Sequence, residues 1–127
     1  MSVAQNHLVA IVDDDELVRS SMASLIRSLG LLAKTFASAD EYLQAKDRHD
    51  VACLVTDIHM PGTSGLELQH ILAGQASSPP VIFMTAFPSE RVRVQAQQSG
   101  AICFIEKPID ESRLVACLGT VFGKLDS

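Results

Sequence analysis

Short apolar runs rich in Val, Ile and Leu recur along the chain, and more polar segments separate them. The runs predict five β-strands with the sequences LVAIV (8–12), LLAKTF (31–36), VACLVT (51–56), VIFMT (81–85) and AICFI (101–105). All but the second run are almost continuously apolar, which is typical of parallel strands covered on both faces.

A helical pattern fills the segments between these runs. Apolar residues recur with the 3.6-residue period of a helix at Val18, Met22, Leu25, Ile26 and Leu29. Gly30 follows them as a suitable C-terminal cap. Ser38 and Ser64 are each followed three residues later by Glu, a capping-box signature that predicts the starts of the second and third helices. Ser89 and Asp110 can cap the fourth and fifth helices.

Strict alternation of strands and helices indicates an α/β fold with a parallel sheet and right-handed crossovers. The length of 127 residues fits one domain over 1–127, and no repeat, linker or low-complexity segment interrupts it. In such a sheet, ligands bind beyond the carboxyl ends of the strands. We therefore expect the functional residues at that edge.

Polar residues stand at or just after four of the predicted strands. They are Asp13, Asp14 and Asp15, then Asp57, Thr85 and Lys107. Each alone would suit an acidic loop, a helix cap, an ordinary strand residue or a solvated charge. Together, crowded carboxylates repel one another unless a cation intervenes. Their oxygen atoms suit Mg²⁺, with Mn²⁺ as an alternative.

Neither the histidines nor the cysteines show ligand spacing. We expect solvated surface positions for His7, His49, His59 and His70. The cysteines are odd in number and lack C-x-x-C spacing, so small buried residues are favoured over metal or redox groups for Cys53, Cys103 and Cys117.

The net charge of -5 argues against binding of nucleic acid by this domain itself, because that requires a concentrated basic surface. No apolar run approaches the ~18 residues that a membrane span needs, and the N-terminus shows neither a basic leader nor a cleavage site. We expect a cytoplasmic location without membrane contact.

Four motifs occur in order: AIVDDDELVR, LVTDIHMPGTSGLEL, VIFMTAF and FIEKP. With them the chain resembles the receiver (REC) domain of two-component response regulators over essentially its whole length. FIEKP, with Phe104, is most similar to the FixJ-like, nitrogen-fixation branch. The resemblance implies a flavodoxin-like (βα)5 doubly wound parallel sheet with strand order 2-1-3-4-5.

The resemblance also implies roles for the strand-end residues. Asp57 matches the phosphoacceptor, which takes a phosphoryl group from a phosphohistidine of a sensor histidine kinase or phosphotransfer protein. Mg²⁺ would be bound by the carboxylates of Asp14 and Asp57 and the backbone carbonyl of His59, with Asp13 acting through water. Lys107 would offset charge on the phosphoryl oxygens, and a cis peptide is expected at Lys107-Pro108.

Signalling would follow from movement of Thr85 toward the phosphoryl group and inward rotation of Phe104, the switch residues by resemblance. The affected face would comprise the fourth helix, fifth strand and fifth helix, including Arg91, Arg93 and Gln95. Phe104 replaces the commoner Tyr, so a hydroxyl is absent there. The resemblance also allows a phosphorylation-dependent homodimer.

Two other functions share part of this pattern. A haloacid dehalogenase-type phosphatase also uses an aspartate nucleophile at a strand end, but it normally has a second Asp where this chain has His59. A degenerate receiver that only docks should lack part of the constellation. We therefore expect a signalling receiver that is not an enzyme.

The output is left open by the sequence, because no helix-turn-helix or enzymatic domain follows the fifth helix. The chain could be a stand-alone receiver acting by protein contact. Alternatively, it could be the receiver of a longer transcription factor, which the FixJ-like resemblance favours.

Overall fold

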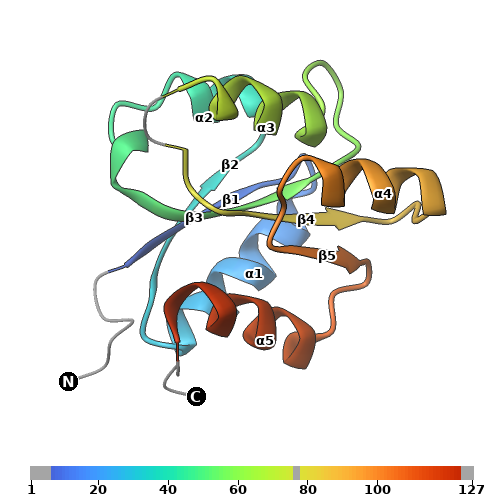
Figure 1. Cartoon of the computed structure of the whole chain (residues 1–127). Coiled ribbons are helices and arrows are strands. Elements are labelled where there is room, and N and C mark those ends of the chain that lie inside the picture. The colour runs from blue at the N-terminus through green and yellow to red at the C-terminus, as the bar shows by residue number, and fades with distance from the viewer. Residues whose placement is uncertain (1–6, 76–77, 124–127) are drawn as a thin grey trace.

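Five parallel strands form the centre of the molecule (Figure 1). The structure is a computed structural model and describes residues 7–75 and 78–123. The strands are β1 (Leu8–Val12), β2 (Leu32–Phe36), β3 (Val51–Asp57), β4 (Val81–Thr85) and β5 (Cys103–Glu106). Their order is β2-β1-β3-β4-β5, which confirms the predicted α/β fold and its topology.

Four of the five α-helices begin directly after the capping residue that the sequence indicates. The helices are α1 (Glu16–Ser28), α2 (Ala39–Leu43), α3 (Gly65–Ala73), α4 (Glu90–Gln98) and α5 (Glu111–Phe122), with a 3-10 turn η1 (Arg48–Asp50) before β3. Ser64 forms a full capping box with Glu67, whereas at Ser38 only half of the box is described, in which the side chain accepts the Glu41 N–H. None of the described helices has both the length and the apolar character needed to cross a bilayer.

Alternation along the strands divides the core between the two faces of the sheet. Val9 and Ile11 pack with α1 and α5, whereas Ala10 and Val12 pack with α2, α3 and α4. Successive strand residues point to opposite faces, so each strand can contribute to both cores. The sheet is thereby a rigid support whose carboxyl edge carries the polar residues.

The fifth strand differs most from its predicted bounds. It begins at Cys103 instead of residue 101, because the Ala101 N–H still bonds back to the Ala96 carbonyl of α4 after Gly100 has turned the chain with φ 89°. β5 lies at the edge of the sheet, so Cys103 and Phe104 are only partly buried. Its apolar run predicts a strand buried on both faces. In β4, by contrast, every residue is buried.

Burial is confirmed for Cys53 and Cys117, but the expectation that the cysteines have no redox role is wrong for Cys103 and Cys117. Cys53 is a free, buried thiol, but Cys103 of β5 and Cys117 of α5 form a disulfide with their Cα atoms 6.0 Å apart. Their separation of 14 residues gives no local motif, and only the packing of α5 on β5 brings them together.

The histidine expectation also needs one correction. His49, His59 and His70 are exposed, but His7 is half-buried and stacks on Phe122 with ring centroids 4.9 Å apart. This stack joins the segment before β1 to the last turn of α5.

Candidate functional site

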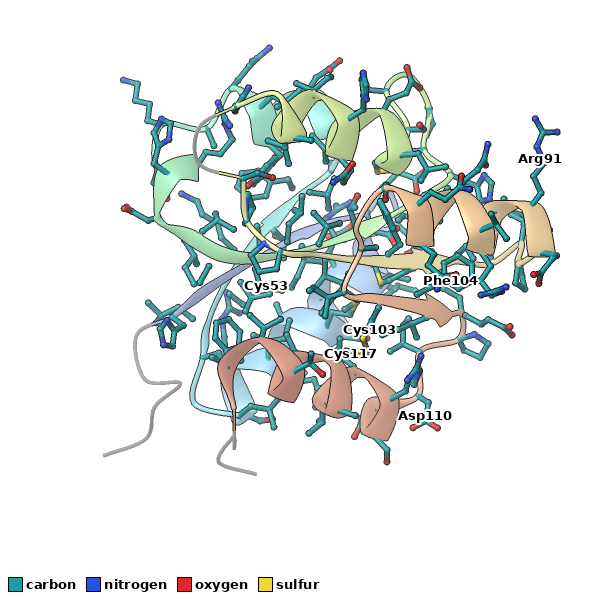
Figure 2. The ribbon with its side chains drawn as sticks, viewed as in Figure 1. Cys53, Arg91, Cys103, Phe104, Asp110 and Cys117 are labelled. Carbon is teal, nitrogen blue, oxygen red and sulfur yellow. A yellow bond between two sulfur atoms is a disulfide. The ribbon has the colours of Figure 1, made fainter. Side chains whose placement is uncertain are left out.

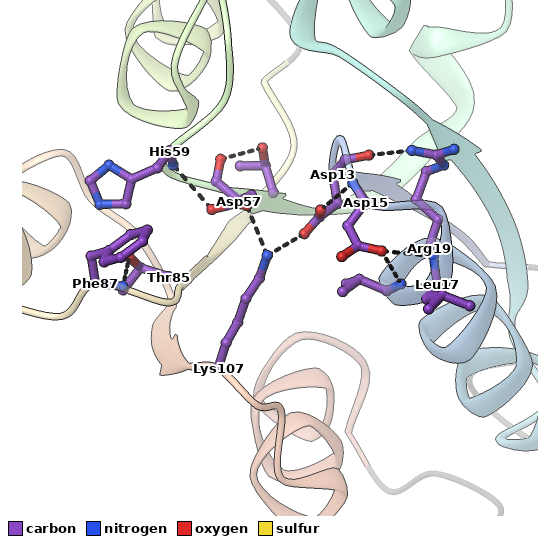
Figure 3. A network of polar contacts seen from close by, with 11 residues as sticks. Asp13, Asp15, Leu17, Arg19, Asp57, His59, Thr85, Phe87 and Lys107 are labelled. Carbon is purple, nitrogen blue, oxygen red and sulfur yellow. Dashed lines mark hydrogen bonds and ion pairs between the residues drawn. The ribbon is translucent and has the colours of Figure 1, made fainter.

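Lys107 joins the ends of two strands at the carboxyl edge of the sheet (Figure 3). Its Nζ lies 2.7 Å from Oδ2 of Asp13, directly after β1, and 2.8 Å from Oδ2 of Asp57, the last residue of β3. Both carboxylates are buried, with residue exposures of 0% and 5%. The structure therefore brings together three residues that the sequence predicted at one edge. The peptide between Lys107 and Pro108 is cis, as expected.

Asp14 completes a cluster of three carboxylates. One oxygen from each of Asp13, Asp14 and Asp57 lies within 4.8 Å of the others, and Asp14 is exposed while the other two are buried. Lys107 is the only cation with a described ion pair to them, so one ammonium faces three carboxylates among the described residues. Closely spaced hard oxygen donors of this kind fit a divalent cation such as Mg²⁺.

Burial and ion pairing have opposite effects on the pKa values of Asp13 and Lys107. Burial raises the pKa of Asp13, while the Lys107 ammonium and the Asp15 N–H act to lower it. Burial acts to lower the pKa of Lys107, but its hydrogen bonds to Asp13 and Asp57 outweigh this effect and raise the pKa. Lys107 therefore stays charged between the two carboxylates.

The β1–α1 loop is held by contacts around Asp13. Oδ1 of Asp13 accepts the Asp15 N–H at 2.8 Å, and the Asp15 side chain caps α1 by accepting from Leu17 N. Arg19 Nη1 donates to the Asp13 carbonyl at 2.8 Å. Sequence reasoning missed Arg19, because an arginine on a helix gives no local sign that it reaches back to the preceding loop.

The β3–α3 junction positions Asp57. Its Oδ1 accepts the His59 N–H at 3.0 Å, and Gly65 N donates to the Ile58 carbonyl at 2.9 Å. A Cβ at Gly65 would lie 2.3 Å from the Asp57 carbonyl oxygen, so only glycine fits there without a shift. Sequence reasoning missed that position 65 requires glycine. The only sign of it in the sequence is that a glycine directly follows the capping serine.

Thr85 ends β4 and is fully buried beside the cluster. Its Oγ1 accepts the Phe87 N–H at 3.0 Å. The Phe87 ring is 71% exposed and meets the His59 ring edge to face, with centroids 5.7 Å apart (Figure 3). The two rings thus lie together at the mouth of the site.

Phe104 lies apart from the polar network. It is next to Cys103 on β5, is half-buried, and packs on the side of the sheet covered by α2, α3 and α4. It pairs in register with Phe83, two residues before the Thr85–Glu106 pair. No contact between Phe104 and Thr85 is among the described interactions.

Sequence comparison places the chain among known signalling proteins. The model of the response regulator receiver domain matches residues 9–119. The chain is 39% identical over 116 residues to the transcriptional regulatory protein FixJ of Azorhizobium caulinodans, covering 91% of this chain and 55% of that protein. It is 37% identical to the response regulator protein TmoT of Ectopseudomonas mendocina, with 91% and 53% covered. The chain therefore spans about half the length of these relatives.

Solved structures agree with this placement. The structure titled FixJ-N superposes with a TM-score of 0.82 and 33% identity, covering 97% of this chain and 98% of that one. The response regulator StyR superposes with a TM-score of 0.83 and 36% identity, covering 92% of this chain and 59% of that one. With the acidic cluster at the strand ends, these matches show that the chain belongs to the response regulator receiver domain family.

Proposed function

We propose that this receiver accepts a phosphoryl group on Asp57 from a phosphohistidine of a sensor histidine kinase or phosphotransfer protein. The observation that carries the proposal is the position of Lys107, which holds Asp57 and Asp13 at 2.8 and 2.7 Å. A buried carboxylate at a rigid strand end, with a cation already beside it, is positioned to act as a nucleophile.

In the reaction, a carboxylate oxygen of Asp57 attacks phosphorus, and the bond between phosphorus and the histidine nitrogen breaks. The departing ring carries a proton on its other nitrogen and therefore leaves as a neutral imidazole, and the phosphoryl group stays on Asp57 as an aspartyl phosphate. Phosphoryl transfer depends mainly on positioning and charge neutralisation. The His59 N–H and Lys107 fix the Asp57 carboxylate from two directions, and Lys107 then offsets charge on the phosphoryl oxygens.

The carboxylates of Asp14 and Asp57 would hold Mg²⁺, with Asp13 acting through water and the backbone carbonyl of His59 as a further ligand by family resemblance. When bound, the ion would neutralise negative charge on the transferring group. A unit charge pair about 4 Å apart contributes about 1 kcal/mol in water and about 4 kcal/mol at an effective dielectric constant of about 20. Burial of Asp13 and Asp57 makes such neutralisation more effective than in open solvent.

Thr85 would transmit phosphorylation to the surface. Its oxygen accepts the Phe87 N–H, which leaves the hydroxyl proton for a phosphoryl oxygen. Movement of Thr85 would allow Phe104 to turn inward and remodel the face formed by α4, β5 and α5. A face changed in this way could bind another copy of the chain or an output domain.

The decisive experiment supplies the purified chain with Mg²⁺ and acetyl phosphate. We expect one acid-stable, base-labile phosphoryl group, as an acyl phosphate should give, and none on Asp57→Asn. Chelation of Mg²⁺ should prevent labelling. Undiminished labelling of Asp57→Asn, or labelling that chelation does not affect, would contradict the assignment.

We further propose that the receiver acts in the cytoplasm and controls transcription through a separate effector domain. The support is the similarity to a transcriptional regulatory protein, of whose length this chain spans 55%. The alternative is a receiver that acts alone by protein contact. Reading the full coding sequence distinguishes the two.

A further inference from the structure

A covalent bond ties two elements of the proposed output face together. Cys103 is the first residue of β5, and Cys117 lies in the second half of α5 (Figure 2). The bond spans 14 residues of sequence. β5 and α5 are therefore linked through side chains as well as through the segment that follows Lys107.

The bond also lies one residue from the proposed switch side chain. Cys103 packs with the core on the α1–α5 side of the sheet, and Phe104 packs with the core on the α2–α3–α4 side. Adjacent strand residues share one stretch of backbone. Any constraint on the position of Cys103 is therefore a constraint on the backbone that carries Phe104.

Cys103 is the more exposed residue of the pair. Cys117 is 1% exposed, whereas Cys103 is only partly buried and lines a cavity of about 280 Å³. Cys53 is fully buried, and burial raises the pKa of its thiol to about 12, so it does not compete as a nucleophile.

Positive charge borders the same cavity. Arg93 of α4 and Arg113 of α5 line it together with Cys103 and Phe104. Arg93 is paired with Glu90, whereas no ion pair of Arg113 is among those described. Arg93 and Arg113 also line the neighbouring cavity, where Glu106 and Asp110 accompany them, but no acidic residue lines the cavity at Cys103. The cavity therefore favours an anionic reagent at Cys103.

We propose that Cys103 and Cys117 form a reversible redox switch, which an anionic small disulfide such as glutathione disulfide closes by entering the cavity beside Arg113. Closure restrains β5 against α5 and weakens the response of Phe104 to phosphorylation. This second part rests on the proposed function. In a reducing compartment, disulfides of this kind are transient and sensory rather than permanent.

The chemistry is thiol–disulfide exchange. The Cys103 thiolate attacks one sulfur of glutathione disulfide, forms a mixed disulfide and releases one glutathione thiolate. Cys117 passes its proton to a released thiolate, attacks the Cys103 sulfur and releases the second glutathione. Two protein thiols are oxidised to one disulfide, and one glutathione disulfide is reduced to two glutathione molecules.

The first experiment follows exchange by mass spectrometry on the reduced chain. Cys117→Ala should trap one glutathione on Cys103, and Cys103→Ser should take up none. Arg113→Gln should slow the reaction with glutathione disulfide several-fold, but not the reaction with neutral hydroxyethyl disulfide. Cys53→Ala is the matched control and should form the Cys103–Cys117 bond like the parent. Glutathione on Cys103→Ser, or no effect of Arg113→Gln, would overturn the proposed entry route.

The second experiment compares oxidised and reduced chains after treatment with acetyl phosphate and Mg²⁺. Both should be labelled, but the amide shift changes of β5 should be at least halved in the oxidised chain. The double variant Cys103→Ser/Cys117→Ala should respond like the reduced parent whether or not oxidant is present. Equal responses in both forms would overturn the coupling. Absence of labelling in the reduced chain would instead overturn the proposed function, and the coupling with it. The mass-spectrometry experiment tests disulfide formation between Cys103 and Cys117 independently of labelling.

Discussion

Asp13 is a buried carboxylate whose ionisation the fold opposes. Its pKa is raised by burial, so protonation favours the folded state and the charged form lowers stability at neutral pH. Asn has nearly the same shape and keeps an oxygen for the Asp15 N–H. Asp13 is thus a residue at which the requirements of the site and of stability conflict.

We predict that, without divalent cations, Asp13→Asn increases the free energy of unfolding near neutral pH, because it removes the buried charge while Lys107 keeps Asp57 as its partner. The gain should shrink as the pH falls through the folded-state pKa of Asp13, because the parent then also becomes neutral. Urea unfolding over a range of pH measures this. Asp50→Asn, at an exposed site in η1, should change the value by less than about 0.5 kcal/mol. Equal or lower stability of Asp13→Asn at neutral pH would contradict the prediction.

Substitution of Thr85 should distinguish the acceptance of phosphate from the conformational response to it. Thr85→Ala should still accept phosphate, because the hydroxyl is not the nucleophile, but it should lose most of the phosphorylation-dependent change around Phe104. Thr85→Ser, which keeps the oxygen that accepts the Phe87 N–H, should respond like the parent. NMR shifts of β5 with and without phosphorylation provide the measurement. A full response from Thr85→Ala would show that the signal takes another path.

The contacting rings of His59 and Phe87 should shield the aspartyl phosphate from water. Removal of one ring opens the approach, so Phe87→Ala should speed loss of the phosphoryl group several-fold, equivalent to about 1 kcal/mol of barrier. The rate is followed in excess Mg²⁺ after removal of the donor. Slower loss from His59→Asn alone would mean that the imidazole assists hydrolysis, and equal rates in all three proteins would reject gating by these rings.

At the scale of the elements, the start of α3 rests directly on the end of β3. The Cβ of an alanine at position 65 would come 2.3 Å from the Asp57 carbonyl oxygen and 2.9 Å from the Ile58 Cα, and both are backbone atoms. Neither can move without displacing the strand end. Precise placement of Asp57 therefore depends on a residue that contributes no functional group.

Gly65→Ala should destabilise the fold by about 1–3 kcal/mol, because α3 and β3 must separate. It should also reduce labelling of Asp57. Gly74→Ala is the matched control at the other end of α3, where φ is −81° and the nearest atom lies at 3.5 Å. It should be neutral or stabilise by up to about 1 kcal/mol. Urea unfolding and acetyl phosphate labelling test both variants, and similar behaviour of the two would refute the steric argument.

The elements were predictable to the extent that their signals are local. Capping residues and apolar periodicity lie within a few residues of the element they define, and they placed all five strands and helices. The predicted start of β5 is two residues too early, because Ala101 is apolar like a strand residue. Its N–H is in fact bonded to a carbonyl of α4. Periodicity cannot show that difference.

At the scale of the whole molecule, the site followed from one topological rule. Lys107 and Asp13 are 94 residues apart, yet the rule that parallel strands end at one edge predicts their proximity. No comparable rule predicts that Cys117 faces Cys103, or that Arg19 reaches the Asp13 carbonyl, because both depend on how a helix is rotated against the sheet. Contacts of that kind require the assembled fold.

Metal binding should stabilise the entire domain. A ligand present at 100 times its dissociation constant adds about 2.7 kcal/mol to the free energy of unfolding. Mg²⁺ should therefore raise the unfolding midpoint of the parent, and chelation should reverse the rise. Asp14→Asn should unfold like the parent without Mg²⁺, since Asp14 is exposed, but should lose most of the Mg²⁺-dependent increase. An unchanged Mg²⁺ effect in that variant would exclude Asp14 as a ligand.

The stack of His7 on Phe122 has a consequence for protein engineering. It holds the two ends of the described chain within one ring contact of each other, at the amino ends of the strands and thus opposite the carboxyl edge of the sheet, where β3 ends at Asp57 (Figure 1). Nearby ends are what circular permutation requires. A short peptide between them could close the backbone, and new termini opened in a surface loop would turn the domain into a sensor whose attached fluorophores sit beside the phosphorylated site.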